Sequence, residues 1–384
     1  MSRRHGAPLR LALFAAALLG AGPAAPAPAG DIAAGPPATA TAGGLQTRLD
    51  VAPGVWVLVE TGFQVQPTGN VTIVEQADGL VLIDAGGSPG AGRRIVAQVR
   101  ALSAKPVKAV VLTHWHGDHV QGLSEILAAW PAARTLATAA TQAHLRDPGA
   151  MNSPASPDPA ANAALQSKLR GYSDYARRMA VSAPSEAEQT GWTRAAALFD
   201  SYRRDMDGAL TVAPREAFSE RLVLPDRERP VELAFLGRAN TDGDAVAWLP
   251  RQKVLVSGDI VVTPVPFGYG SYPGAWIATL RRLEAYPFRT LVPGHGPPQH
   301  DAAGLRRLID ALAEIRAKVA PLAATGLSPG EIRARLDVSD QAEMFAGGDP
   351  WLRRWVAAYW LDPIVASAVR EARGEPIVQG LGGG

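Results

Sequence analysis

Cysteine is absent from the 384 residues of this chain. Its absence excludes disulfides, lipid attachment through cysteine and thiolate ligands for a metal. Any metal that the protein binds must therefore be held by nitrogen and oxygen atoms. The chain is also short of charge, with 19% Asp, Glu, Lys and Arg and a formal net charge of +2. Such a near-neutral balance gives no electrostatic reason to expect binding of nucleic acid.

The N-terminal region lacks an apolar run long enough to span a membrane. Basic residues precede an apolar run at 11–19 and small residues at 27–29, which is the order found in a secretory signal peptide. We therefore expect residues 1–29 to be removed, although an uncleaved membrane anchor is the alternative. Loss of their three arginines would leave 35 basic residues against 36 acidic ones. The sequence thus predicts a periplasmic or secreted bacterial protein without a stable membrane anchor.

Strand and helix signals alternate after a linker. Residues 30–44 are rich in Ala, Gly, Pro and Thr, which predicts a flexible linker. Ala77–Gly79 predicts a hairpin turn, and residues 90–103 have the pattern of a crossover helix. Hairpins followed by a βαβ unit indicate an α/β fold. The expected strands are 55–59, 71–75, 80–84, 107–112, 134–138, 221–224, 231–236, 245–249, 253–257 and 290–292, and further helices are expected at 120–130 and 275–286.

A helical insertion at about 150–215 interrupts this pattern. Apolar residues recur there at helical spacing in two segments, and Ser185–Glu188 has the spacing of a capping box before the second. The aromatic residues among them predict a packing face, and a lid over the functional site is the alternative. The apolar positions are Leu165, Leu169, Tyr172 and Met179 in the first segment and Trp192, Ala195, Phe199, Tyr202 and Met206 in the second.

The chain beyond residue 300 is predicted to be entirely helical. Trp351, Trp355 and Tyr359 share one face of a helix in this region. We expect that face to pack against the rest of the chain, with a homodimer contact as the alternative.

Three of the seven histidines lie within six positions, in the segment Thr113–His119 that reads T-H-W-H-G-D-H. The segment follows an apolar, valine-rich run at 107–112 that is typical of a buried strand. Gly117 allows a tight backbone course, so the polar side chains can converge at the end of that strand. Imidazole and carboxylate together suit zinc and similar divalent metals. The segment therefore predicts a metal site.

Four further polar points stand at strand ends or in glycine-rich turns: Asp84, Asn240–Asp244, Gly258-Asp259 and Gly294-His295. Taken in order with the histidine segment, they resemble the five sequence motifs of the metallo-β-lactamase superfamily. The resemblance implies an αββα sandwich with a dinuclear metal site at one edge between two β-sheets. It covers roughly residues 45–300, so the chain is predicted to comprise a signal peptide (1–29), a linker (30–44), a metallo-β-lactamase-like domain (45–300) and a C-terminal helical extension (301–384).

The resemblance also implies a role for each ligand. His114 and His116 would belong to the first metal, and Asp118, His119 and His295 to the second. Asp259 matches the aspartate that bridges both metals in most hydrolases of this superfamily. Asp84 matches the acid that orients the histidine segment through hydrogen bonds.

One position departs from the family pattern. The third motif of the family, G-x-x-H-T-x-G-D, has Asn240 in place of its histidine. An amide oxygen is a weaker donor for zinc than imidazole, so we expect one firmly bound Zn²⁺ and a second, weakly bound one. The remaining histidines of the mature chain are His144 and His300. His144 could substitute as a ligand, and packing or surface exposure is the alternative.

The expected activity is that of an exported zinc-dependent hydrolase. Metal-bound hydroxide would attack an ester, thioester, lactone or amide of a small-molecule substrate, and Asp118 would orient this nucleophile. Tyr269 and Tyr272 lie in a glycine- and aromatic-rich segment that would contact the substrate, or only pack. A β-lactamase-type amide hydrolase is an alternative, although typical β-lactamases lack the aspartate that matches Asp259. The other alternative is a metal-binding protein whose catalysis is weak or lost and which acts as a binding module.

Overall fold

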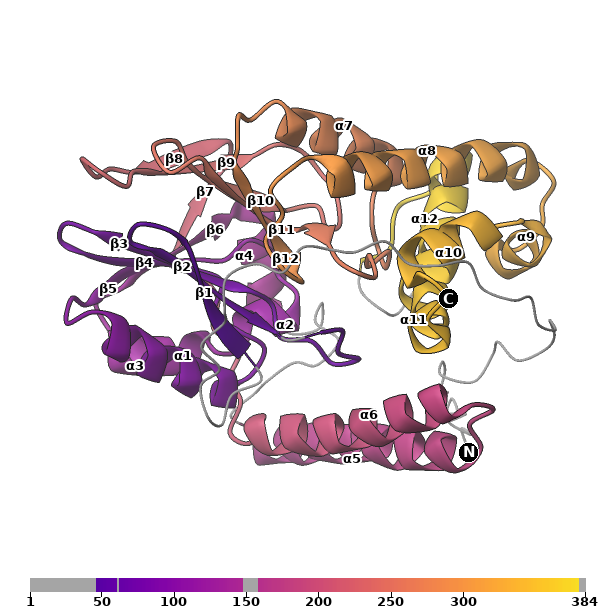
Figure 1. Cartoon of the computed structure of the whole chain (residues 1–384), viewed down its shortest axis with the longest axis horizontal. Helices are drawn as coiled ribbons and strands as arrows, with labels where there is room; N and C mark the ends of the chain where they lie inside the picture. Colours follow the sequence, from indigo (N-terminus) through magenta and orange to yellow (C-terminus); the bar gives the residue numbers. More distant parts are fainter. Residues whose placement is uncertain (1–45, 61, 148–157, 380–384) are drawn as a thin grey trace, which may run out of the picture. The chain divides into compact units, whose positions relative to one another are not determined.

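The computed structural model describes residues 46–60, 62–147 and 158–379 (Figure 1). The chain divides into two units, Met1–Pro36 and Pro37–Gly384, and every described residue belongs to the second. The predicted signal peptide and linker lie outside the described residues and stay predictions. Within the described ranges, no helix has the length and the hydropathy needed to cross a membrane.

The first half of the described chain forms a seven-stranded sheet in which strand order follows the sequence from β1 to β7. The pairs from β1 to β4 are antiparallel, and those from β4 to β7 are parallel. Parallel pairing places the carboxyl ends of β4 and β5 at one edge, where Asp84 and Thr113–His119 follow. The strands are β1 (Gln46–Ala52), β2 (Val55–Glu60), β3 (Val71–Gln76), β4 (Gly79–Ile83), β5 (Val107–Val111), β6 (Arg134–Thr138) and β7 (Glu216–Phe218).

A second sheet of five strands has the order β12-β11-β10-β9-β8. Its strands are β8 (Arg221–Leu224), β9 (Val231–Phe235), β10 (Ala245–Leu249), β11 (Val254–Val262) and β12 (Thr290–His295). The fourth of these strands was predicted to end at Ser257, with Asp259 beyond it, and this prediction is wrong. Gly258 has φ +53° and shifts the register with β12, but the strand continues through Asp259 to Val262.

The two sheets face each other across a shared core. Val57 and Val59 of β2 and Val111 of β5 pack in one cluster with Leu233 of β9 and Val256 of β11. Side chains alternate along the strands, so Leu58 points to the opposite face of the first sheet. Each sheet therefore has one inner face and one outer face.

Helices cover the two outer faces (Figure 1). Ile95 of α1 (Pro89–Leu102) and Ile126 of α3 (Leu123–Ala129) pack on the first sheet. Trp276 of α7 (Pro273–Glu284) and Leu312 of α8 (Ala303–Ala323) pack with residues of the second. The order helix, sheet, sheet, helix confirms the predicted αββα sandwich.

The insertion contains two long helices, α5 (Pro159–Val181) and α6 (Glu186–Asp205), which pack against each other. Ser185 caps α6 by accepting a hydrogen bond from the backbone N–H of Glu188, as predicted. Trp192 of α6 lies 5.2 Å from Trp351 and 5.6 Å from Trp355 between ring centroids. These aromatic residues therefore pack within the chain, joining the insertion to the C-terminal helices.

The remaining helices are short or C-terminal. Residues 356–361 form a π-helix, an uncommon element that often occurs at functional sites. The helices are α2 (Gly117–Val120), α4 (Ala139–Arg146), α9 (Pro329–Arg335), α10 (Ser339–Ala346), α11 (Pro350–Trp355), η2 (Val356–Leu361) and α12 (Asp362–Arg373).

Candidate metal centre

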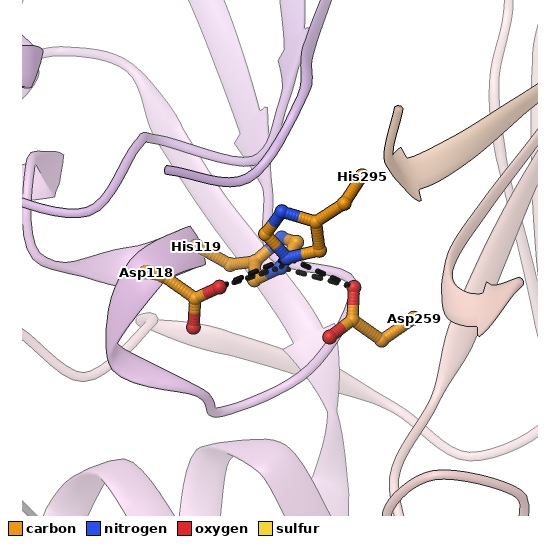
Figure 2. Close-up of side chains that lie close together, drawn as sticks. All are labelled: Asp118, His119, Asp259 and His295. Atoms are coloured by element: carbon orange, nitrogen blue, oxygen red, sulfur yellow. Dashed lines mark hydrogen bonds and ion pairs between the residues drawn. The ribbon is translucent and has the colours of Figure 1, made fainter. Parts of the chain in front are cut away.

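Two groups of His and Asp side chains meet beyond the carboxyl end of β5. Asp118, His119, Asp259 and His295 form one group, shown in Figure 2, and His114, His116 and Asp259 form the other. Within each group the candidate ligand atoms lie within 4.8 Å of one another. Six of the seven metal ligands predicted from the sequence are thus brought together by the fold.

Asp259 belongs to both groups, and its two oxygens face different histidines. Oδ2 lies 3.5 Å from Nε2 of His114 and 3.8 Å from Nδ1 of His116. Oδ1 lies 3.1 Å from Nε2 of His119 and 3.5 Å from Nε2 of His295. A carboxylate in this position can bridge two metal ions, because each ion can take one of its oxygens.

Glycine at position 294 makes this close approach possible. A Cβ atom on Gly294 would lie 1.9 Å from Oδ1 of Asp259, well inside any real contact. The glycine beside His295 is therefore required by the site itself, and it does not merely form a loop.

Asp84 orients histidines of both groups. Its carboxylate accepts hydrogen bonds from the backbone N–H of Thr113 at 2.7 Å, the hydroxyl of Thr113 at 2.9 Å and Nδ1 of His119 at 2.8 Å. Because the Thr113 hydroxyl donates to Asp84, its oxygen can accept from Nδ1 of His114 at 3.0 Å. This network assigns the proton of both rings to Nδ1 and leaves each Nε2 lone pair for a metal.

The site fits a metal on two further observations. Nε2 of His114 is buried and makes no hydrogen bond within the described residues. Nε2 of His119 and Nε2 of His295 face each other at 3.1 Å, although only one of them can donate to the other. A cation in each donor group would satisfy these nitrogen atoms, and imidazole with carboxylate is a donor set that zinc favours.

The His and Asp side chains of the centre shift one another's pKa values. Burial lowers the pKa of His114 to about 4, so this ring is neutral at pH 7. Against the effect of burial, His119 and His295 hold the pKa of Asp259 well below its usual range. Asp259 and Asp118 in turn raise the pKa of His119 well above its ordinary value, although burial opposes this. A divalent ion would displace the proton from His119, so metal binding should release a proton.

Comparison with known proteins identifies the family. Residues 66–295 match the sequence profile of the Metallo-beta-lactamase superfamily. The chain belongs to this superfamily. The motif resemblance is thereby confirmed over more than half of the sequence.

Alkylsulfatases are among its relatives. A linear primary-alkylsulfatase from Pseudomonas sp. (strain ATCC 19151) is 26% identical over 304 residues, which cover 74% of this chain and 52% of that protein. The solved sec-alkylsulfatase Pisa1 from Pseudomonas sp. is 20% identical with a TM-score of 0.55, covering 84% of this chain and 50% of the other. A metallo-beta-lactamase from Pontibacter korlensis is 18% identical with a TM-score of 0.48, covering 70% of this chain and 99% of the other.

This chain spans about half the length of the alkylsulfatases that it matches. At 20% identity, the likeness to Pisa1 shows the fold alone. Membership of the superfamily and the relation to the primary alkylsulfatase together support the prediction of a metal-dependent hydrolase.

Asn240, the departure from the superfamily pattern, is fully buried. Its amide nitrogen donates to the backbone oxygen of Phe267 at 2.5 Å, and its amide oxygen makes no hydrogen bond within the described residues. The ring of Phe267 lies 5.5 Å from that of His116. The amide is thus held, with an unsatisfied oxygen, by the residue whose ring contacts His116.

The two tyrosines predicted to contact substrate have different surroundings. Tyr269 packs on Phe267 at 5.2 Å between ring centroids. Tyr272 lies under the guanidinium group of Arg238 at 5.1 Å. Within this segment it is the ring of Phe267, not that of either tyrosine, which lies against the predicted ligand His116.

His144 does not join either donor group. Its Nε2 lies 3.0 Å from a carboxylate oxygen of Asp242, and its ring stacks on Trp115 at 4.8 Å. This arrangement favours packing over a role as substitute ligand.

Proposed function

We propose that the protein is an exported zinc-dependent hydrolase that cleaves sulfate monoesters of alcohols with an apolar chain. The observation that carries the hydrolytic part is the position of Asp259, which offers one oxygen to each of two donor groups. The choice of a sulfate ester is supported by the 26% identity to a linear primary-alkylsulfatase over 304 residues. The predicted signal peptide supports export, and zinc is favoured by the donor set.

The more exposed side chains of the centre suggest how the substrate and the attacking water are oriented. The side chains of His114, His119 and Asp259 are 0–3% exposed, whereas those of Asp118 and His295 are 18% and 12% exposed. Metal ions bound here would acidify water and polarise an ester oxygen. Asp118 presents its carboxylate at the open edge, where it can accept a hydrogen bond from the attacking water and orient it.

Half-buried aromatic rings extend from His116, whose side chain is 11% exposed. Phe267 contacts His116 at 5.5 Å and Tyr359 of η2 at 5.8 Å, and Tyr359 contacts Phe63 at 6.5 Å, all between ring centroids. These rings offer an apolar surface beside the reacting group, which suits an alkyl chain better than a sugar or nucleotide. Burial of one methylene group contributes about 0.8 kcal/mol, or roughly a fourfold gain in affinity.

A substrate panel tests the proposal. Zinc-loaded protein would be given butyl, octyl and dodecyl sulfates beside carboxylic esters, a thioester, a lactone, a β-lactam and a phosphodiester. We expect inorganic sulfate to be released, most efficiently from the long-chain esters, with loss of activity on chelation and recovery on adding zinc. Cleavage of the carboxylic substrates without any release of sulfate would refute the sulfate-ester assignment.

A metal-binding protein with weak catalysis is the second candidate, and Asn240 is the observation that favours it. We expect Asn240→His to strengthen binding of the weaker zinc ion by roughly tenfold or more, because imidazole is the better donor. A rise in turnover with affinity would indicate a damaged catalytic site. A fall in turnover despite firmer metal binding would indicate that the amide serves the native reaction. Calorimetric zinc titration and the sulfate assay measure the two effects separately.

A further inference from the structure

One buried asparagine holds the segment that carries His295. Asn70 directly precedes β3 and is 4% exposed. Its backbone N–H donates to the oxygen of Gly294 at 2.8 Å. Its side-chain amide donates to the oxygen of Pro293 at 2.9 Å and to that of Gly296 at 2.8 Å. Three carbonyl groups on both sides of His295 are thus bound by a single residue.

The preceding residue contacts the other half of the same donor group. The N–H of Gly69 donates to the backbone oxygen of Asp118 at 2.9 Å. A Cβ atom at Gly69 would lie 2.4 Å from the ring of His119, so this backbone runs directly against that ligand. Residues 69 and 70 therefore connect the Asp118–His119 turn to the segment of His295.

No strand pairing sets the distance between these two halves in the described structure. Asp118 and His119 follow β5 in the first sheet, whereas His295 ends β12 in the second. Hydrogen bonds within each sheet do not set the separation of the sheets, which depends on the shared core and on the few bonds that join the two sheets, such as that from the N–H of Ala245 to the backbone oxygen of Thr113. A metal ion needs its ligands placed to within a few tenths of an ångström.

We propose that Asn70 is a positioning residue for the metal centre, which holds His295 at the distance from Asp118 and His119 that one ion requires. The two amide hydrogens of Asn70 position His295 through their hydrogen bonds. The amide oxygen of Asn70 does not contribute, because it is buried without a hydrogen-bond partner among the described residues. Asn70→Asp tests this directly, since it keeps the size of the side chain and removes both donors. Asn70→Ala removes the whole amide.

Gln76, at the opposite end of β3, provides a matched control. It is 0% exposed, and its amide donates to the backbone oxygens of Leu224 and Arg229 at 3.2 and 2.6 Å. Its amide oxygen also makes no hydrogen bond among the described residues. Gln76→Glu and Gln76→Ala therefore remove the same kind of buried bonds between the same two sheets, away from the metal centre.

The first measurement is a zinc titration of the full chain after its metal has been removed by chelation, with a competing chromophoric chelator to resolve each binding step. The second is urea unfolding of the metal-free protein, which measures its stability. We expect both Asn70 variants to lose roughly 10- to 100-fold in affinity at one step only. The Gln76 variants should keep both affinities within about twofold while losing comparable stability. The absorption spectrum of bound Co²⁺ should change in the Asn70 variants alone, because the ligand geometry changes.

Unchanged affinity in the Asn70 variants, or an equal loss in the Gln76 variants, would overturn the proposal. If Asn70→Asp does not fold, Asn70→Ser, which keeps one donor, enters the same comparison. The inference rests on metal binding by the proposed hydrolase, but the titration uses no substrate. Its failure is therefore distinguishable from a failure of the sulfate-ester assignment.

Discussion

Glu60, the last residue of β2, allows a quantitative test of the buried environment around the centre. Its side chain is 8% exposed, and Oε1 makes no hydrogen bond within the described residues. Burial raises the pKa of Glu60 from 4.5 to about 7, despite opposing contributions from the backbone of Thr68 and from His295. We predict that Glu60→Gln, which removes the charge at almost constant volume, stabilises the metal-free protein at high pH.

The sign follows from proton binding. The unfolded chain loses the proton of Glu60 near pH 4.5, whereas the folded chain keeps it until about pH 7. The folded state therefore binds more protons within this window, and its stability falls as pH rises from 4.5 to 7. A shift of this size corresponds to about 3 kcal/mol above pH 7, at 1.36 kcal/mol for each pH unit. The glutamine variant has no such loss.

Urea unfolding of both proteins, after chelation of metal, measures the effect. We expect the advantage of Glu60→Gln over the native chain to grow by about 3 kcal/mol between pH 4.5 and pH 8.5. Glu220→Gln, at an exposed residue, controls for the loss of one carboxylate from the chain. An advantage that does not change with pH, or a glutamine variant that is less stable at pH 8.5, would refute the reasoning.

Two further variants test the catalytic proposal. Asp118→Ala should lower zinc-dependent turnover by at least about 100-fold, since it removes both a ligand and the group that orients water. The release of sulfate under saturating zinc measures this loss, and near-native turnover would contradict the role of Asp118. Phe267→Ala should lower kcat/KM for dodecyl sulfate by roughly 10-fold or more and that for butyl sulfate by much less, because the longer chain buries more apolar surface against the aromatic rings. Tyr286→Ala, at a half-buried ring that packs on Trp248 instead, is the control, and an equal loss for both esters in Phe267→Ala would count against an apolar subsite.

The fold class and most of the metal centre were predictable from local sequence. Thr113–His119 carries four donors within six positions, so the backbone alone keeps them close. Asp84 and His295 each come at the end of a short apolar run next to glycine or a turn, and the resemblance to the superfamily motifs placed them in the site. Hydrophobic periodicity likewise gave the strands and the long helices, since it reflects which face of each element is buried.

Other parts of the site depended on contacts between distant segments. Gly258 was interpreted as the end of a strand, but pairing with β12 resumes beyond it and carries β11 on to Val262. Asn70 and Glu60 carry no sequence signal, because Asn and Glu are ordinary residues at strand ends. The backbone oxygen of Tyr359 accepts a hydrogen bond from Gly268, so η2 contributes to the position of the neighbouring Phe267.

The sequence by itself determined which donors the protein has and that the centre lies at the end of β5, because these features depend on covalent order and local periodicity. The tertiary structure alone decided that the two oxygens of Asp259 face two different groups of histidines. It also decided that Gly69 and Asn70 connect the turn that carries Asp118 to the segment of His295. Those contacts join the two sheets, and their geometry exists only once the sheets have packed on their common core.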